Sequence, residues 1–431
     1  MTADTAIDAA CAQLSEERLR DLVVGMVGIP SPTGDEAPLA EWLTGTLRDA
    51  GLAAETQWID ERQASAIGRL PGEGNGDDVL LYAPIDTLTV GDASEDVPWI
   101  GPELRNDMKP EAIVSGHHVL GLGASNPKGH GAAVIAAAEA LAKAGIPLGG
   151  DVIVGLGAGG MPTDGRLIGG RTRRNTGQGV GCSFMLEQGV WADHAIIAKP
   201  GWAVAWEEVG LCWFEVRVRG TFGYVGSRHR IPYRNPIDAA AIVVRELEDW
   251  FPRYAEKHTD GLVAPQGIVS AIESGWPRLA SVTPALCRFQ VDLRTSPRGT
   301  PASVRREFGE AIREILKRHP EIELDWSMRL AIPGTHTDPG APVVRAAVEA
   351  WEHLEGRPHQ PIVANSGATD ANILRNRGLP TARVGMDRIG PDAPIPLDFP
   401  AGMNVVDLRE ADRLARHLIH TVVHLAGRNR S

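Results

Sequence analysis

The chain has 431 residues, about three times the commonest domain size, and this length predicts two domains rather than one. Hydrophobic residues make up 43% and charged residues 23%, as in ordinary globular proteins, which excludes long disordered regions. Forty-three Lys and Arg against 55 Asp and Glu give a net charge of -12, the wrong sign for binding nucleic-acid phosphates or anionic lipid. We therefore expect a small-molecule partner.

The cysteines and the N-terminus indicate a cytoplasmic protein. The four cysteines lie far apart with no CxxC pair, which is typical of reduced thiols. The N-terminal run MTADTAIDAACAQLSEERLRDLV has early acidic residues and lacks the apolar core of a signal peptide. The most apolar helical stretch, Gly131–Ile146, carries Glu139 and Lys143 and is too short and polar to span a bilayer.

The first part of the chain alternates helical and strand patterns. Apolar residues recur at helical spacing in three segments, and two short apolar runs bounded by turn residues have the pattern of buried strands. The predicted helices cover 17–27, 37–50 and 128–143, and the predicted strands cover 78–83 and 151–156. The order strand, crossover helix, strand in 78–156 predicts an α/β domain.

The pattern changes after a glycine-rich, basic segment at 161–179, which we expect to be a surface loop. From Gly210 onward, long alternating strands and long helices indicate a separate α+β domain inserted into the first. Its expected elements are strands at 211–222 and 285–294 and helices at 238–250 and 301–318. These patterns predict one domain over 1–206 and 331–431, ending in a helix at 408–425, and a second over 207–330.

Several motifs occur in a characteristic order. LLYAPIDTLTVGD is followed by GLGASNPKGHGAAVIAAAEAL, then by VRGTFGYVGS, VDLRTSP and NSGATDANILRNRGLPTARVG. This series resembles the zinc aminoacylase and carboxypeptidase G metallopeptidase family, which includes acetylornithine deacetylase and succinyl-diaminopimelate desuccinylase. The resemblance implies an α/β catalytic domain with a central, mostly parallel sheet, and an inserted α+β lid domain through which the family forms dimers.

The metal ligands of that family are absent from the matching positions. The histidine of the first motif falls on Pro84, the bridging aspartate on Asn126, and the carboxylate before the lid on Lys199. The paired glutamates fall within 158–162, which contains no acid, and the last histidine falls on Phe399 or Pro400. Zinc requires imidazole, thiolate or carboxylate ligands. We therefore expect no metal and no other cofactor at this site.

Lys199 is the most informative replacement. The resemblance implies that its ammonium points into the cavity where the metals would lie, so it is a candidate catalytic residue. It would bind a carboxylate or a developing oxyanion, or act as a neutral amine. The alternative is a lysine that pairs with Asp86 and only fills the vacated space.

Three further residues are candidate catalytic groups. Asp86 keeps its family identity and would serve as a general base beside Lys199. Tyr224 stands where the lid histidine of the family polarises the scissile carbonyl, and a phenol can donate the same hydrogen bond. His130 replaces the second glycine of the KGG motif and is either a new acid or base or a surface histidine near a helix N-terminus.

The candidate substrate-binding residues follow from the same resemblance. Arg294 matches the arginine that holds the substrate carboxylate, and a planar guanidinium suits that task. The lid asparagine that assists it in the family falls on Ser281. The other candidates are Asn126, Lys128, Ser366, Gly367 and Thr369.

Histidines elsewhere offer weaker hypotheses. His117 or His118, with His130 and Asp86, would build a relocated metal site, although adjacent strand residues point to opposite faces, so only one of the first two can be a ligand. His420 and His424 share one helix face, but Thr421 replaces the glutamate of a zincin motif. We expect those two to be a surface pair.

These observations lead to one principal hypothesis and two alternatives. The principal one is a metal-independent hydrolase that cleaves an amide, lactam or cyclic imide C–N bond in a small carboxylate-bearing substrate or amino-acid derivative. The alternatives are a lyase or isomerase that uses Lys199 as base, and a non-catalytic pseudoenzyme that binds such a molecule. In each case we expect a homodimer formed through the lid domain.

Overall fold

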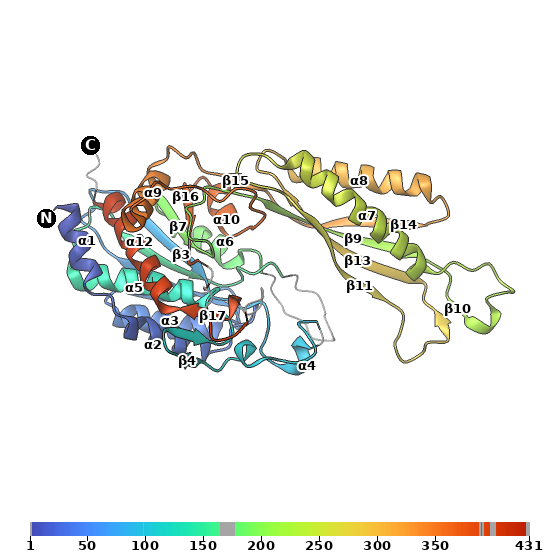
Figure 1. Ribbon diagram of the computed structural model, residues 1–431, viewed down its shortest axis with the longest axis horizontal. Coiled ribbons are helices and arrows are strands. Elements are labelled where there is room, and N and C mark those ends of the chain that lie inside the picture. The colour runs from blue at the N-terminus through green and yellow to red at the C-terminus, as the bar shows by residue number, and fades with distance from the viewer. Residues whose placement is uncertain are drawn as a thin grey trace. The chain divides into compact units, whose positions relative to one another are not determined.

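The computed structural model describes residues 2–97, 99–163, 177–387, 389, 392–396 and 402–427, and divides the chain into two compact units (Figure 1). Unit 1 comprises 1–206, 337–361 and 369–431, and unit 2 comprises 207–336 and 362–368. Unit 2 thus begins where the inserted domain was expected, but it ends six residues later than 330 and also takes in 362–368. Most of the expected basic loop, and both Phe399 and Pro400, lie outside the described residues.

Unit 1 is built on a six-stranded sheet with the order β1-β2-β6-β3-β7-β16. The strands β6, β3, β7 and β16 are parallel to one another. The strands β1 and β2 extend the sheet beyond β6, and each is antiparallel to its neighbours. Its strands are β1 (Ala53–Trp58), β2 (Ala64–Leu70), β3 (Val79–Pro84), β6 (Val152–Gly157), β7 (His194–Ala198) and β16 (Thr381–Val384). The expected α/β class with a mostly parallel central sheet is confirmed.

Helices cover both faces of this sheet. The described helices of unit 1 are α1 (Ala3–Cys11), α2 (Glu16–Val27), α3 (Ala37–Asp49), α4 (Ala93–Asp96), α5 (Lys128–Ala144), α6 (Val180–Glu187), α9 (Pro342–Glu355), α10 (Ala371–Asn376) and α12 (Leu408–Ala426). Along β3, Val79, Leu81 and Ala83 pack under the group that contains α5 and α12, whereas Leu80 and Tyr82 pack under α6 and α10. A strand buried on both faces explains why 78–83 reads as a continuous apolar run.

A small second sheet joins distant parts of unit 1. It has the order β17-β5-β4, with β4 at Ile113–Ser115, β5 at His118–Leu120 and β17 at Val405–Asp407. β17 pairs with β5 in antiparallel register, which sets Asp407 directly opposite His118. The backbone of Met403 and Asn404, just before β17, continues this pairing by accepting from the N–H groups of Gly121, Ser125 and Asn126.

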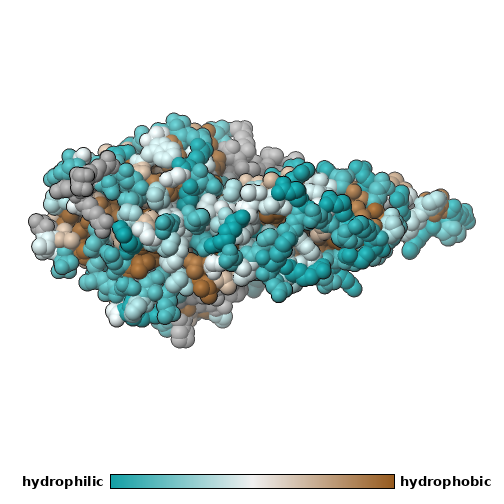
Figure 2. Space-filling model, turned by 90° about the horizontal axis from the view of Figure 1, so that it is seen from above, coloured by the Kyte–Doolittle hydropathy of each residue, from teal (hydrophilic) through white to brown (hydrophobic). Residues whose placement is uncertain are grey.

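Unit 2 contains a four-stranded antiparallel sheet, β11-β13-β9-β14, with two helices packed on one face. Its elements are β8 (Glu207–Glu208), β9 (Gly210–Arg219), β10 (Gly223–Tyr224), α7 (Pro236–His258), β11 (Gly267–Ser274), β12 (Val282–Thr283), β13 (Leu286–Thr295), α8 (Pro301–Arg318), β14 (Leu324–Ile332) and β15 (Thr335–His336). Alternate residues of β9 and β13 meet Phe308 and Tyr254 in the core. Figure 2 shows that the outer surface of α7 and α8 is mainly hydrophilic.

Within the described residues, no helix is both long and apolar enough to cross a membrane.

Candidate active site

The carboxyl ends of three parallel strands bring the predicted site residues of unit 1 to one edge of the main sheet. β6, β3 and β7 run parallel side by side, so the chain leaves Gly157, Pro84 and Ala198 at the same edge. In open α/β sheets this is the edge at which ligands bind. The segments that follow these strands carry Asp86, residues 158–161 and Lys199.

Lys199 and Asn126 meet at this edge. The Lys199 Nζ donates a hydrogen bond to Asn126 Oδ1 at 3.3 Å, although Asn126 precedes α5 and Lys199 follows β7. Lys199 is only 5% exposed, and its backbone N–H donates to Val384 O at the end of β16. Two positions that match metal ligands by motif therefore lie side by side, one a lysine and the other an asparagine.

The contacts of Asp86 differ from the pairing with Lys199 that the sequence suggested. Its carboxylate accepts three hydrogen bonds from other groups. The donors are the Thr33 hydroxyl at 2.6 Å and the backbone N–H groups of Gly160 and Met161 at 2.7 and 2.8 Å. Asp86 is fully buried, so these donors replace its hydration and tie the segment after β6 to the end of β3.

Glu36 is a buried acid of this edge that the sequence motifs did not indicate. Its Oε1 accepts from the N–H groups of Gly34 and Gly159 and from Gln63 Nε2, at 3.0, 2.9 and 3.2 Å. Its Oε2 is buried with no hydrogen-bond partner among the described residues. Burial, and next the charge of Asp86, raise the pKa of Glu36 to about 8, so it carries a proton at neutral pH.

The segment that replaces the paired glutamates of the resemblance fits tightly around these two acids. Consecutive N–H groups at Gly159, Gly160 and Met161 point to the two carboxyls. Gly159 has φ +62°, a left-handed conformation that favours glycine. A Cβ on Gly160 would lie 2.3 Å from Pro84 Cβ. The segment therefore accepts no side chain at Gly160 while proline occupies position 84.

A second buried pair lies behind this segment. The Tyr82 hydroxyl donates to Asp370 Oδ2 at 2.8 Å, and both residues are buried. Burial and the neighbouring Asp370 raise the pKa of Tyr82, so the phenol stays protonated as a donor. Thr369, a predicted substrate-binding residue, has its Oγ1 accepting from Ala371 N at 3.2 Å at the start of α10. The pair links β3 to the segment before α10.

His130 and Lys128 are buried and hydrogen-bonded within the protein. Both ring nitrogens of buried His130 are engaged: Nδ1 with Ser125 O at 2.8 Å, and Nε2 as acceptor from Met386 N at 3.2 Å. Burial lowers the pKa of His130 to about 3, which keeps the ring neutral. Lys128 is buried too and donates to Ile29 O at 3.0 Å, and burial lowers its pKa to about 7. His130 is therefore a packed structural histidine rather than a surface one or an acid.

The remaining candidates belong to unit 2. Arg294 forms an ion pair with Asp292, with Nη2 2.8 Å from Oδ2, and its Nη1 reaches Ser366 O at 3.5 Å. The Ser366 Oγ is buried without a hydrogen-bond partner among the described residues, and Gly367 N donates to Asn365 Oδ1. Tyr224, on the short strand β10, is 61% exposed.

Two histidine predictions can be compared directly with the structure. His118 and Asp407 lie close together, while exposed His117 turns away to Glu16, as expected for adjacent strand residues. The expected surface pair on α12 is wrong for His420, which is 6% exposed and packs against the His353 ring at 4.6 Å. The reason is that α12 is buried on more than one side, between α1, α5 and α9.

Comparison with solved structures identifies the fold. The dipeptidase Dug1p of Saccharomyces cerevisiae matches with a TM-score of 0.74 at 11% identity, over 100% of both chains. The YxeP protein of Bacillus subtilis, a dinuclear metal-binding peptidase of the M20 family, matches at 0.62 and 15% identity, over 96% of this chain and 98% of its own. An amidase of the hydantoinase/carbamoylase family from Burkholderia multivorans matches at 0.62 and 14% identity, over 97% and 99%. No family sequence model matches the chain.

The chain therefore has the fold of the M20 metallopeptidases over nearly its whole length. This agrees with the family resemblance of its motifs, and the expected architecture of an α/β catalytic-type domain with an α+β lid domain is confirmed.

The contacts of Asp86 predict a loss of stability in Asp86→Asn. The amide group would turn an N–H toward backbone donors, so one buried hydrogen bond to a charged acceptor becomes a donor–donor contact. We expect the free energy of unfolding in urea to fall by about 2–4 kcal/mol. Asp21→Asn, at an exposed position of α2, is the matched control. A loss below about 0.5 kcal/mol, the usual range for a surface substitution, would show that the contacts do not hold this edge together.

The protonated state of Glu36 predicts a pH-dependent effect of Glu36→Gln. The folded protein retains this proton between about 4.5 and about 8, whereas the unfolded chain loses it near 4.5. The group therefore makes wild type lose stability as pH rises through that window, by at most about 1.4 kcal/mol per unit.

Glu36→Gln has no proton to lose, so its stability relative to wild type should increase from pH 5 to pH 8.5 in urea titrations. Glu41→Gln, on the exposed side of α3, provides the baseline. If the difference in the free energy of unfolding between Glu36→Gln and wild type stays constant with pH, Glu36 is ionised in the folded state.

Proposed function

We propose that this M20-fold chain is a hydrolase of a C–N bond in a small carboxylate-bearing substrate, and that it works without metal ions at the motif positions of the family. The bond is an amide, lactam or cyclic imide. The contact between Lys199 and Asn126 at the carboxyl edge of the parallel strands is the observation that carries this proposal. An ammonium there supplies positive charge where the related motif has an acid that binds metal.

Two chemical roles suit the Lys199 amine. As an ammonium it would stabilise the oxyanion that forms when a carbonyl is attacked. As a neutral amine it would act as a base or form a covalent bond with the carbonyl carbon. Asn126 accepts from the amine and so orients it, while its own side-chain N–H groups remain suited to a substrate oxygen.

The state of the two buried acids restricts the substrate. Asp86 already accepts three hydrogen bonds, and Glu36 is protonated at neutral pH, so both are poor bases for activating water. A bound metal ion would contribute several kcal/mol of transition-state stabilisation and would itself generate hydroxide. Without that contribution, we propose that the bond is strained or otherwise activated, as in a lactam or a cyclic imide.

Recognition of the substrate carboxylate is assigned to unit 2. We propose that Arg294 binds it, since the guanidinium offers five donors and uses only part of them on Asp292 and Ser366. Ser366 and Gly367 lie in the same unit, and the buried Ser366 hydroxyl offers a further donor. The exposed Tyr224 phenol remains the proposed donor from the lid. All four cysteines are free and buried, which supports the proposed cytoplasmic location.

The proposed function is tested with a panel of substrates in H2(18)O. The panel holds N-acyl amino acids, carboxylated lactams and cyclic imides, and products are followed by mass spectrometry. Hydrolysis incorporates one heavy oxygen in the product, and turnover should persist after chelator treatment at a temperature where the protein stays folded. Product without heavy oxygen would indicate a lyase or isomerase. Ligand-induced thermal stabilisation without any product would indicate a pseudoenzyme.

Lys199→Met tests the residue that carries the proposal. We expect a loss of at least about tenfold to hundredfold in kcat/KM, because a charge-assisted contact is worth roughly 1.5–3 kcal/mol. A larger loss in kcat with KM unchanged would assign a transition-state role, and borohydride trapping with substrate would identify a Schiff base. The control is Lys143→Met, on the exposed end of α5. Full turnover by Lys199→Met would contradict the proposal.

We further propose a homodimer formed through unit 2. Its edge strand β11 exposes Ile268 at 54% and Ile272 at 58%, and an unpaired edge with apolar side chains favours pairing with a second copy. Figure 2 also shows hydrophobic residues at the end of the unit that carries β10.

Light scattering should therefore give a dimer mass at micromolar concentration. Ile272→Asp should convert the dimer to a monomer, because a charge would be buried in the new interface. Ile237→Asp, which changes an exposed isoleucine at the start of α7, should leave the mass unchanged. A monomeric wild type would refute the dimer. Tyr224 could then not donate a hydrogen bond in the site of a second subunit.

A further inference from the structure

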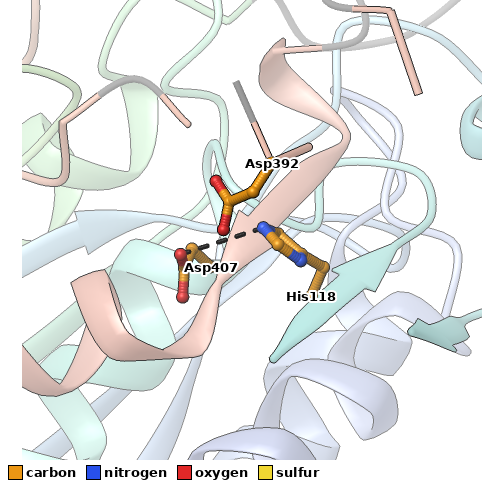
Figure 3. A group of neighbouring side chains, drawn as sticks. All are labelled: His118, Asp392 and Asp407. Carbon is orange, nitrogen blue, oxygen red and sulfur yellow. Dashed lines mark ion pairs between the residues drawn. The ribbon is translucent and has the colours of Figure 1, made fainter. Parts of the chain in front are cut away.

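A group of three potential metal ligands lies at the small sheet of unit 1, apart from the positions that match the family's metal ligands. It consists of His118 on β5, Asp407 at the end of β17, and Asp392 in the segment 392–396 (Figure 3). One ligand atom from each lies within 4.8 Å of the others. The sequence offered His118 as a ligand of a relocated metal site together with His130 and Asp86, but it did not indicate Asp392 or Asp407.

The backbone fixes two of these residues relative to each other. His118 and Asp407 are direct partners in the antiparallel pairing of β5 with β17, so their side chains leave the sheet on the same face. Figure 3 shows the His118 ring turned toward both carboxylates. The strand register thus fixes the positions of His118 and Asp407, and these two residues need little reorganisation to hold a ligand.

The imidazole of His118 has an unsatisfied nitrogen. Its side chain is 8% exposed, and its buried Nε2 has no hydrogen-bond partner among the described residues. The nearest carboxylate atom, Asp407 Oδ2, is 3.8 Å from Nε2, too far for a hydrogen bond. Ligand atoms of a tetrahedral zinc ion at bond lengths of about 2.0–2.2 Å are about 3.4 Å apart. The observed separation is therefore near that of two ligands of one ion.

The carboxylates are already arranged around a positive charge. Arg409 Nη2 donates to Asp392 Oδ2 at 2.9 Å and to Asp407 Oδ2 at 2.5 Å, and Arg409 Nε donates to Asp407 Oδ1 at 2.9 Å. The hydrogen bonds from Arg409 hold the pKa of Asp392 below its usual range, so that carboxylate is ionised. Two carboxylates against one guanidinium leave a net negative charge. Because the Arg409 side chain is 50% exposed, it can turn into solvent when another cation arrives.

We propose that His118, Asp392 and Asp407 bind one divalent zinc-type ion, with water as a further ligand and Arg409 displaced. One imidazole and two carboxylates form a ligand set that suits zinc, whereas magnesium and calcium prefer oxygen ligands alone. The ion fastens β17 to β5, and thereby holds Met403, whose carbonyl accepts from Asn126 N. Its role is structural, and it is independent of the proposed hydrolysis at Lys199.

Cobalt titration of chelator-treated full-length protein tests this site. We expect one Co2+ per chain in calorimetry, with visible d–d absorption of a low-coordinate site, and competition by Zn2+. His118→Gln should abolish binding, and Asp392→Asn should weaken it at least tenfold. Arg409→Gln should strengthen binding about tenfold, because the competing cation is gone. His194→Gln is the control, since buried His194 pairs with the carboxylate of Asp77 at 3.2 Å and belongs to no group of three potential metal ligands in the part of the chain that the structure describes.

Two outcomes would overturn the proposal. One is the absence of Co2+ binding at millimolar metal in both wild type and Arg409→Gln. The other is binding that persists unchanged in His118→Gln and Asp392→Asn. If His118→Gln fails to fold, Asp392→Asn decides, because its side chain is 57% exposed and contributes no buried packing. A rise in melting temperature with Zn2+ that His118→Gln and Asp392→Asn lose, but His194→Gln retains, would confirm the site without reference to activity.

Discussion

The carboxyl edge of the main sheet depends on the hydrogen bonds that two buried acids receive. Asp86 and Glu36 together accept backbone N–H groups from three consecutive residues, Gly159 to Met161. A buried carboxylate without partners would cost several kcal/mol, so these donors are essential to the fold. The proton on Glu36 removes the second negative charge that such a close pair could not retain. Hydrogen bonds and one proton therefore stabilise the two acids at this edge.

The polar groups at the two ends of this edge of the sheet have different kinds of contacts. Near β6, the backbone N–H groups of 159–161 bind the two carboxyl groups and tie this segment to them. Near β7, the side chains of Lys199 and Asn126 are in direct contact, at two positions that match metal ligands by motif. Any chemistry at this edge is therefore expected on the β7 side, which is why the proposed function rests on Lys199 rather than on Asp86.

The elements of the fold were predictable because they follow hydrophobic spacing. The long helix α8 was expected at 301–318 and has those bounds, and the strands β3 and β6 lie within one residue of their expected ranges. The site was less predictable because burial and backbone donors leave no mark in the sequence. Glu36 lies in a loop outside the motifs, 123 residues from its partner Gly159. His130 changed from a candidate acid to a packed residue through a contact with Met386, which no local pattern indicates.

The tight contact between Gly160 and Pro84 has an evolutionary consequence. By motif, Pro84 matches a histidine and Gly160 lies within the range 158–162 that matches the paired glutamates, and a Cβ on Gly160 would lie 2.3 Å from Pro84 Cβ. An acidic side chain at position 160 is therefore incompatible with proline at position 84. The order in which substitutions can be accepted here consequently runs from position 84 to position 160.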